Sequence, residues 1–197
     1  MSFTLPTPFS ALIFDCDGTL VDTAPAHYFA ITEALKMQGH SMNREWYMAR
    51  AGLTPDALLD AQETAVAAAG KVAPLDRATV FATYNDHFRA GLHLLREVEA
   101  VASLARAWHG KVPMSVASNG RLANVQASLR VTGLLPLFDL IVSADDVAHG
   151  KPAPDVFLEA ARQMGVPPAE CVVLEDSDEG LHAASAAGMR AMDVRLA

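Results

Sequence analysis

The chain has 197 residues, of which 51% are hydrophobic and 19% charged, and its formal net charge is −8. This composition excludes a disordered, collagen-like or disulfide-stapled chain and is sufficient for a sizeable core. The length fits a core of about 120 residues that carries an inserted subdomain. An acidic chain without a basic run is a poor match for nucleic acid or an anionic membrane, so we expect neither as a partner.

The two cysteines, Cys16 and Cys171, lie far apart and form no CxxC motif. This usage is typical of a reducing compartment. The N-terminus has no basic segment followed by a long apolar one, and no apolar run reaches the roughly 18 residues of a membrane span. We therefore expect a cytoplasmic protein.

Five short apolar runs have strand character, and helical periodicity fills the intervals between the last four. The runs are residues 12–14, 113–117, 140–143, 171–174 and 192–196, and the intervening helices are expected at 121–131, 154–164 and 179–187. Strands and helices that alternate at intervals of about 20 to 30 residues are typical of right-handed βαβ units. The sequence therefore predicts an α/β protein whose core is a Rossmann-like parallel sheet.

The interval after the first strand is too long for one crossover connection. It is almost entirely helical in pattern, with helices expected at 26–38, 55–69 and 76–95. Thr54 and Pro55 fit the N-cap and first position of the second of these helices. We predict an all-helical cap at residues 23–95, inserted into a catalytic core made of residues 1–22 and 96–197.

Polar side chains follow four of the predicted strands, at the edge where ligands bind in parallel α/β sheets. They are Asp15 and Asp17, Ser118 and Asn119, Lys151, and Glu175 and Asp176. Crowded carboxylates need a compensating cation, and an all-oxygen ligand set suits Mg²⁺. A lysine and a hydroxyl suit a phosphoryl group. The pattern thus indicates a magnesium-dependent phosphoryl-transfer site.

Four motifs at these strand ends resemble those of the haloacid dehalogenase superfamily. They read DCDGT at 15–19, SNG at 118–120, GKPAPD at 150–155 and LEDS at 174–177. The resemblance implies that Asp15 attacks phosphorus to form an aspartyl-phosphate, and that Asp17 is the general acid and base. Dehalogenases of this superfamily lack the carboxylate at the position of Asp17, so its presence implies a phosphatase or a phosphomutase.

The same resemblance implies the remaining roles in the core. Mg²⁺ is expected to be held by Asp15, the backbone carbonyl of Asp17 and Asp176, with Glu175 bound directly or through water. The phosphoryl oxygens are expected to be bound by three groups, which are Ser118, the amide of Asn119 and Lys151.

The cap resembles that of the β-phosphoglucomutase-like branch. His27 stands where the mutases have a histidine near the leaving group, and a role in substrate contact and a plain helix histidine both stay open. Gly52 and Thr54 resemble the substrate-specificity loop of the cap. Where the mutases follow this loop with an arginine for the second phosphate, this chain has Pro55.

The C-terminal half resembles small bacterial sugar-phosphate phosphatases of this branch. We therefore expect a phosphoric monoester hydrolase that acts on small phosphorylated metabolites, with fructose 1-phosphate as the best single candidate. The enzyme alternative is β-phosphoglucomutase, which Pro55 disfavours. The non-enzyme alternatives are a receiver-like module and a sugar-phosphate sensor. Because a cap must open and close and no apolar stripe is left over, we expect a monomer.

Overall fold

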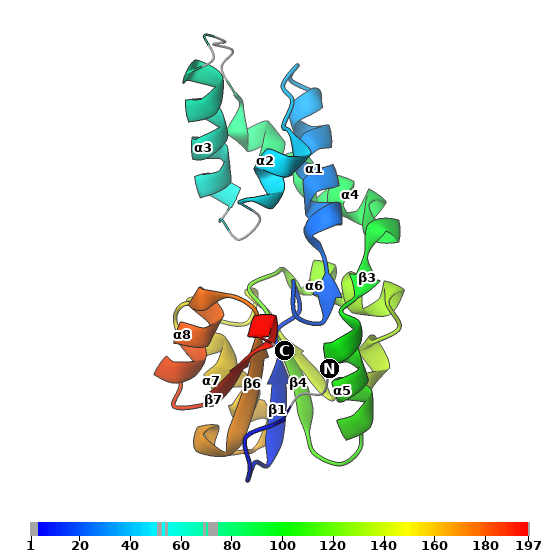
Figure 1. Cartoon of the computed structure of the whole chain (residues 1–197), viewed down its shortest axis with the longest axis vertical. Helices are drawn as coiled ribbons and strands as arrows, with labels where there is room; N and C mark the ends of the chain where they lie inside the picture. The colour runs from blue at the N-terminus through cyan, green and yellow to red at the C-terminus, as the bar shows by residue number, and fades with distance from the viewer. Residues whose placement is uncertain (1–3, 51–52, 54, 69, 71–74, 197) are drawn as a thin grey trace. The chain divides into compact units, whose positions relative to one another are not determined.

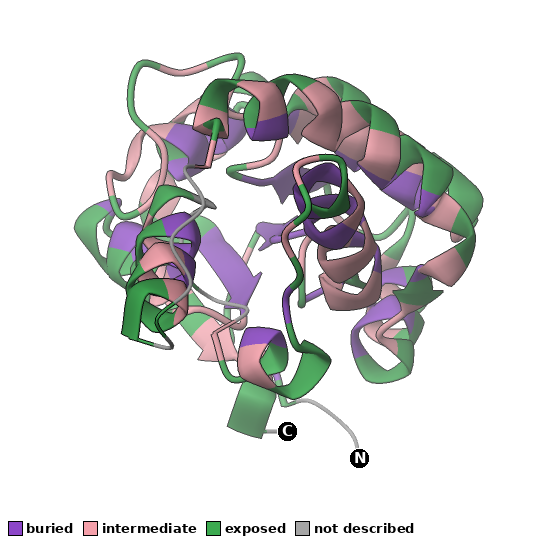
Figure 2. Ribbon diagram, turned by 90° about the horizontal axis from the view of Figure 1, so that it is seen from above, coloured by how far each residue is buried: buried purple, intermediate pink, exposed green. Residues whose placement is uncertain are grey.

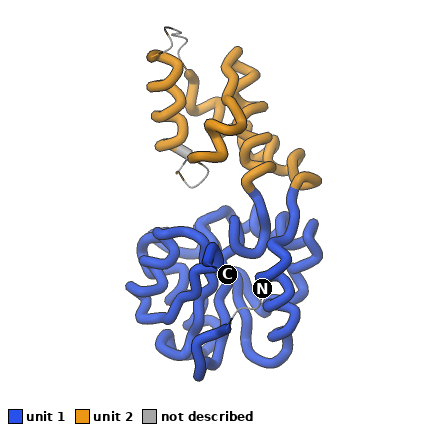
Figure 3. The backbone as a smooth tube through the Cα atoms, in the orientation of Figure 1, with its two compact units in different colours: residues 1–23, 95–197 blue, residues 24–94 orange. Residues whose placement is uncertain are grey.

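The computed structural model describes residues 4–50, 53, 55–68, 70 and 75–196. The chain divides into two compact units, one made of residues 1–23 and 95–197 and the other of residues 24–94 (Figure 3). In the described part of the chain, none of the helices has the length and apolar character needed to cross a membrane.

The first unit is built on a five-stranded parallel sheet with the order β5-β4-β1-β6-β7 (Figure 1). The strands are β1 (Ala11–Phe14), β4 (Met114–Ala117), β5 (Leu140–Val142), β6 (Cys171–Glu175) and β7 (Arg190–Asp193). The three central strands β4, β1 and β6 are buried along their whole length, which explains why they are continuous apolar runs. The predicted α/β class with a parallel sheet is confirmed.

Four helices cover the sheet. They are α5 (Glu99–Trp108), α6 (Leu122–Val131), α7 (Asp155–Met164) and α8 (Asp178–Ala186). Strand order reverses direction after β5, so right-handed crossovers place α5 and α6 on one face and α7 and α8 on the other. On the second face, Ile13 of β1 is buried in one cluster with Phe157 of α7 and Ala183 of α8. Figure 2 shows helices that carry both buried and exposed positions, as expected where one side of a helix packs against a core.

The chain leaves and re-enters the first unit through a two-stranded antiparallel ribbon. Its strands are β2 (Val21–Asp22) and β3 (Arg96–Glu97). Three single turns of 3₁₀ helix complete this unit, and they are η2 (Leu135–Leu137), η3 (Pro168–Glu170) and η4 (Val194–Leu196).

The second unit is helical, as the sequence predicts for the insert. Its elements are α1 (Ala24–Lys36), α2 (Arg44–Met48), α3 (Pro55–Ala68), α4 (Arg77–Ala90) and the 3₁₀ turn η1 (Leu92–Leu94). Leu35, Leu59 and Val80 from three of these helices share one buried cluster. Tyr47 lies inside this cluster and Trp46 packs against it, so both aromatic residues stabilise the helical unit.

Some element boundaries differ from the prediction. The last strand was expected at 192–196, but β7 spans Arg190–Asp193 and residues 194–196 form η4. Asp193 is the last residue paired with β6, and its carboxylate accepts a hydrogen bond from the Arg195 backbone N–H, which turns the chain out of the sheet. The helix expected at 76–95 ends at Ala90, where Gly91 caps it. Helices α2 and α5 were not predicted.

Both thiols are expected to react slowly in the folded protein. Burial, together with the carboxylate of Glu170, raises the pKa of Cys171 to about 11, and burial raises the pKa of Cys16 well above its usual range. A thiol of pKa about 11 is only about 0.1% thiolate at pH 8, against roughly a quarter for an exposed cysteine. Titration with an aromatic disulfide at pH 8 should therefore be roughly 10²-fold slower in buffer than in denaturant. A fast thiol in the native protein would contradict this burial.

Candidate active site

The centre of the site is an ion-paired lysine. The Lys151 ammonium lies 2.6 Å from Oδ1 of Asp15 and 2.7 Å from Oε2 of Glu175. All three side chains are almost fully buried, at 4%, 8% and 1% exposure. The ammonium also lies 4.8 Å from the centre of the Phe157 ring. One cation is thus shared by two carboxylates in an environment of low dielectric, where each interaction is strong.

Sheet topology brings these groups together. β1 and β6 are neighbours in the sheet, and the pairing of Phe14 with Leu174 places the following residues, Asp15 and Glu175, side by side at the carboxyl edge. Lys151 comes from the loop between β5 and α7. The crevice at which strand order reverses is the usual ligand site of an open parallel sheet.

The Glu175 carboxylate is fixed by the start of α8. Its Oε1 accepts hydrogen bonds from the backbone N–H groups of Asp176 and Ser177 and from the Ser177 hydroxyl, at 3.1, 3.0 and 2.8 Å. A Cβ at Gly180 would lie 2.0 Å from the Glu175 carboxyl group, so only glycine fits there. Glu175 is therefore held by donors on one oxygen and by Lys151 on the other.

The carboxylates of Asp176 and Asp17 each accept a hydrogen bond from a hydroxyl group. The Thr19 hydroxyl donates to Oδ1 of Asp176 at 2.8 Å, and the Ser118 hydroxyl donates to Oδ2 of Asp17 at 3.3 Å. Gly18 has a φ of +89°, and a Cβ there would lie 2.2 Å from the Asp176 carboxylate. Both the backbone conformation and the close approach require glycine directly after Asp17 in the first motif.

The carboxylates of the site outnumber the Lys151 ammonium that they surround. Burial raises the pKa of Asp15 well above its usual range, against the opposing effect of Lys151. Burial also raises the pKa of Asp176, with the Thr19 hydroxyl acting in the opposite direction. Burial alone lowers the pKa of Lys151, but Asp15 and Glu175 more than offset this and raise it. The lysine therefore stays charged, while its carboxylate neighbours favour a further cation.

Three carboxylates are placed to hold that cation. Asp15, Glu175 and Asp176 each offer an oxygen, and these oxygens lie within 4.8 Å of one another. The donor set consists of oxygen only, which suits a hard divalent ion. The acidic cluster could thus bind a metal ion.

The structure gathers all seven predicted core residues in the first unit. Asn119, which follows Ser118, uses its carboxamide to bind the backbone of Lys151. Roles for Thr19, Ser177 and Phe157 were not predicted from the sequence. Thr19 and Ser177 lie inside two of the four motifs, so their positions could have indicated a role. Phe157 could not be recognised from the sequence, because a phenylalanine in a helix is normally part of the core.

The carboxylates of Asp145 and Asp146 have a loop-capping role. Oδ2 of Asp145 accepts a hydrogen bond from the Leu122 N–H at the start of α6. Oδ2 of Asp146 accepts from the backbone N–H and the hydroxyl of Ser143. These bonds satisfy backbone donors at the end of β5 and the start of α6.

Of the three cap residues predicted to contact substrate, only His27 lies in the described part of the chain, because Gly52 and Thr54 fall outside it. His27 is in the first turn of α1, where Nδ1 shares a short hydrogen bond with the Tyr84 hydroxyl and the ring stacks on Phe88. The hydrogen bond to Tyr84 and the stacking on Phe88 fix the orientation of the His27 imidazole within the helical unit.

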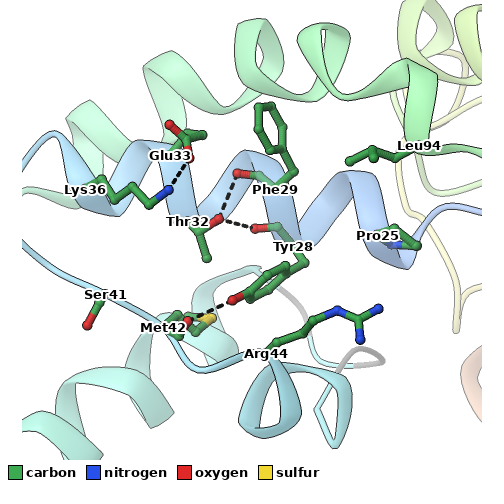
Figure 4. A pocket seen from close by; sticks show the side chains of 10 residues that line it. All are labelled: Pro25, Tyr28, Phe29, Thr32, Glu33, Lys36, Ser41, Met42, Arg44 and Leu94. Atoms are coloured by element: carbon green, nitrogen blue, oxygen red, sulfur yellow. Dashed lines mark hydrogen bonds and ion pairs between the residues drawn. The ribbon is translucent and has the colours of Figure 1, made fainter.

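The helical unit also contains a pocket of about 460 Å³ between α1 and residues 41–44 (Figure 4). Some of the polar groups in its lining form hydrogen bonds or ion pairs within the helical unit. The Tyr28 hydroxyl donates to the Met42 carbonyl, and Lys36 pairs with Glu33. His27, the predicted cap residue that lies in the described part of the chain, does not line this pocket.

Comparison with known proteins identifies the family. The family profile of haloacid dehalogenase-like hydrolases matches residues 9–188. This chain belongs to that family. Fructose-1-phosphate phosphatase YqaB of Escherichia coli is 38% identical over 95% of this chain and 97% of its own length. β-Phosphoglucomutase of Bacillus subtilis is 27% identical over 93% of this chain and 82% of its own length.

A solved structure of the family shows the same fold. The crystal structure of a CbbY variant from Rhodobacter sphaeroides, in complex with xylulose 1,5-bisphosphate, superposes with a TM-score of 0.75 at 30% identity. The match covers 93% of this chain and 85% of that one. The expected superfamily and enzyme class, a haloacid dehalogenase-type phosphatase, are therefore confirmed.

Proposed function

We propose that this haloacid dehalogenase-like hydrolase is a magnesium-dependent phosphatase that acts on small sugar phosphates through an aspartyl-phosphate intermediate. The observation that carries the proposal is the Lys151 ammonium, buried between Asp15 and Glu175, with Asp176 completing a three-carboxylate cluster. One carboxylate is available as nucleophile and one cation can bind the transferring phosphoryl group. The remaining acidic groups can hold a metal ion.

In the first step, Oδ of Asp15 attacks phosphorus and the sugar oxygen leaves. Apart from this nucleophile, the protein contributes charge and position. Lys151 stabilises charge on the equatorial oxygens, together with the Ser118 hydroxyl and the backbone N–H of Asn119. Asp17 gives its proton to the leaving oxygen and then takes one from the water that hydrolyses the acyl phosphate.

Mg²⁺ fits the carboxylate cluster and the all-oxygen donor set. We propose that Asp15, Asp176 and the backbone carbonyl of Asp17 hold it, with Glu175 as a direct or water-mediated ligand. When bound, the ion supplies positive charge that draws the nucleophile and the phosphoryl oxygens together.

Fructose 1-phosphate is our first candidate substrate. The relative with 38% identity over nearly the full length of both chains is named for this activity. Pro55, at the position of the phosphate-gripping arginine of the mutases, supports hydrolysis over phosphomutation. We keep His27, Gly52 and Thr54 as the proposed substrate contacts of the cap, a monomer as the active form and the cytoplasm as the location.

The experiment that tests this function is phosphate release from fructose 1-phosphate, 6-phosphogluconate and β-glucose 1-phosphate. Wild type and Asp15→Asn are compared with Mg²⁺ and with a chelator. The proposal expects release that needs both Mg²⁺ and Asp15, with the highest kcat/KM for fructose 1-phosphate. Formation of glucose 6-phosphate from β-glucose 1-phosphate and a bisphosphate primer, without phosphate release, would instead identify a mutase. Absence of both activities would contradict the proposed function.

Asp17→Asn should slow both chemical steps, because an amide neither gives nor takes the proton. The amide oxygen can still accept the Ser118 hydroxyl bond, so the geometry is retained. The expected loss in kcat is about 10²–10⁴-fold on a sugar phosphate. An aryl phosphate with a good leaving group needs no proton in the first step, so stopped-flow assays should show a burst of phenol followed by slow turnover. Asp86→Asn is the control for an exposed aspartate, and full turnover by Asp17→Asn would overturn the assignment.

A further inference from the structure

The Asn119 side chain is bonded to the backbone of a single residue, Lys151. Its Nδ2 donates to the Lys151 carbonyl at 3.1 Å, and its Oδ1 accepts from the Lys151 N–H at 2.8 Å. Asn119 follows β4, whereas Lys151 lies 32 residues later in the loop between β5 and α7. The carboxamide thus fastens the lysine's peptide groups to the edge of the sheet.

Gly150 leaves the space that this contact needs. A Cβ at residue 150 would lie 2.6 Å from Oδ1 and 3.1 Å from Cγ of Asn119. The φ of Gly150 is not positive, so glycine is required here for space and not for backbone conformation. An alanine would displace the carboxamide while its own backbone stayed unstrained.

The side-chain ammonium of Lys151 is also held in place. The ammonium bonds Asp15 and Glu175 and lies over the Phe157 ring. A lysine side chain is long and flexible, so placing its ammonium requires that the backbone be fixed too. The segment between β5 and α7 contains only turns and bends, and regular backbone bonding does not fix Lys151 there. The carboxamide of Asn119 supplies this anchor.

We propose that Asn119 is a positioning residue whose carboxamide sets the place of the Lys151 ammonium in the active site. The inference rests on the proposed phosphatase function and concerns the side chain only. Oδ1 and Nδ2 are both engaged with Lys151, so the side chain acts on the reaction through the lysine. A misplacement of about 1 Å is sufficient to lower a rate about 10²-fold.

The first test is whether the effect of Asn119 passes through Lys151. Asn119→Ala is made in wild type and in Lys151→Ala, and turnover of a fluorogenic aryl phosphate is measured. In wild type the expected loss is about 10²-fold, mainly in kcat because the ammonium acts on developing charge. In the Lys151→Ala background the same change should alter kcat by less than about 3-fold, because additivity fails for residues that act through one contact. Equal losses in both backgrounds would overturn the proposal.

Asn119→Asp should lie between wild type and alanine, because a carboxylate accepts from the Lys151 N–H but does not donate to its carbonyl. Asn43→Ala is the matched control. The Asn43 carboxamide also accepts a backbone N–H bond, as the N-cap of α2, but lies outside the site. That control should lower the unfolding temperature slightly and leave kcat unchanged.

The second test uses stability and does not depend on activity. Gly150→Ala should lower the unfolding temperature in wild type, where its Cβ meets Asn119. In the Asn119→Ala background it should have little effect or raise stability, since the obstructing atoms are gone. The same decrease in both backgrounds would refute the contact. If wild type hydrolyses no phosphate ester, the proposed function fails, and this stability cycle still decides whether Asn119 and Gly150 are coupled.

Discussion

Lys151→Ala is expected to lower kcat by about 10²–10³-fold, the usual effect of removing one preorganised group that stabilises transition-state charge. The change also leaves Asp15 and Glu175 buried without their shared cation. The pKa of Asp15, which burial already raises, should rise further, so less of the nucleophile is ionised. Steady-state kinetics with saturating Mg²⁺ and a sugar phosphate is the measurement.

The same variant should be less stable, by about 3–5 kcal/mol, because breaking a buried ion pair leaves an uncompensated charge. This deficit should shrink as the pH falls, since protonation of the two carboxylates removes the charge that lacks a partner. Lys151→Met separates charge from packing, because it keeps a long side chain near Phe157. Lys111→Ala, at an exposed lysine, is the surface control. Near-normal kcat in either Lys151 variant would show that this lysine has no catalytic role.

Asp176→Asn should have opposite effects on stability and on activity. In the absence of metal, the asparagine removes one charge from a cluster in which burial raises the pKa of Asp176. Its amide oxygen can still accept the Thr19 hydroxyl bond. The metal-free protein should therefore unfold at a higher temperature, and each 1 kcal/mol gained corresponds to about 2–4 °C for a chain of this size.

With Mg²⁺, wild type should have the higher unfolding temperature of the two proteins. A ligand at 100 times its Kd stabilises the folded state by about 2.7 kcal/mol, and wild type should show such a shift in the unfolding temperature. The variant should lose both this shift and its phosphatase activity, because a cation ligand is gone. Asp178→Asn, at an exposed aspartate two residues later in the first position of α8, should keep both. A full Mg²⁺ shift in Asp176→Asn would place the metal elsewhere.

Much of the core could be predicted because its signals are local. The runs at 12–14 and 171–174 are apolar on both faces, as buried parallel strands require, and the structure places them in neighbouring strands. The motifs stand directly after those strands, so the topology alone brings Asp15 and Glu175 together. The helical character of the insert could also be predicted from the sequence, since the segments that form α1, α3 and α4 have helical periodicity.

Other features were not predicted, for reasons that differ from one element to the next. α5 follows the ribbon without a capping side chain, because its N-cap is Val98. The last strand was misplaced because residues 192–196 are apolar enough for a strand, and the local hydrogen bond from the Arg195 N–H to the Asp193 carboxylate that ends it was not recognised as a turn. Phe157 was not recognised because its contact with the Lys151 ammonium depends on how α7 packs on the sheet.

The sequence by itself determined the α/β class, the helical insert and the chemical groups of the site, because periodicity and the residues after each strand encode them. Only the tertiary structure decided how those groups are held. The bonds of Asn119 to Lys151, and the close approaches of Gly150 to Asn119 and of Gly18 to Asp176, join segments far apart in the chain. A glycine in the sequence does not reveal which side chain will occupy the space beside it, since that depends on the packing of the whole fold.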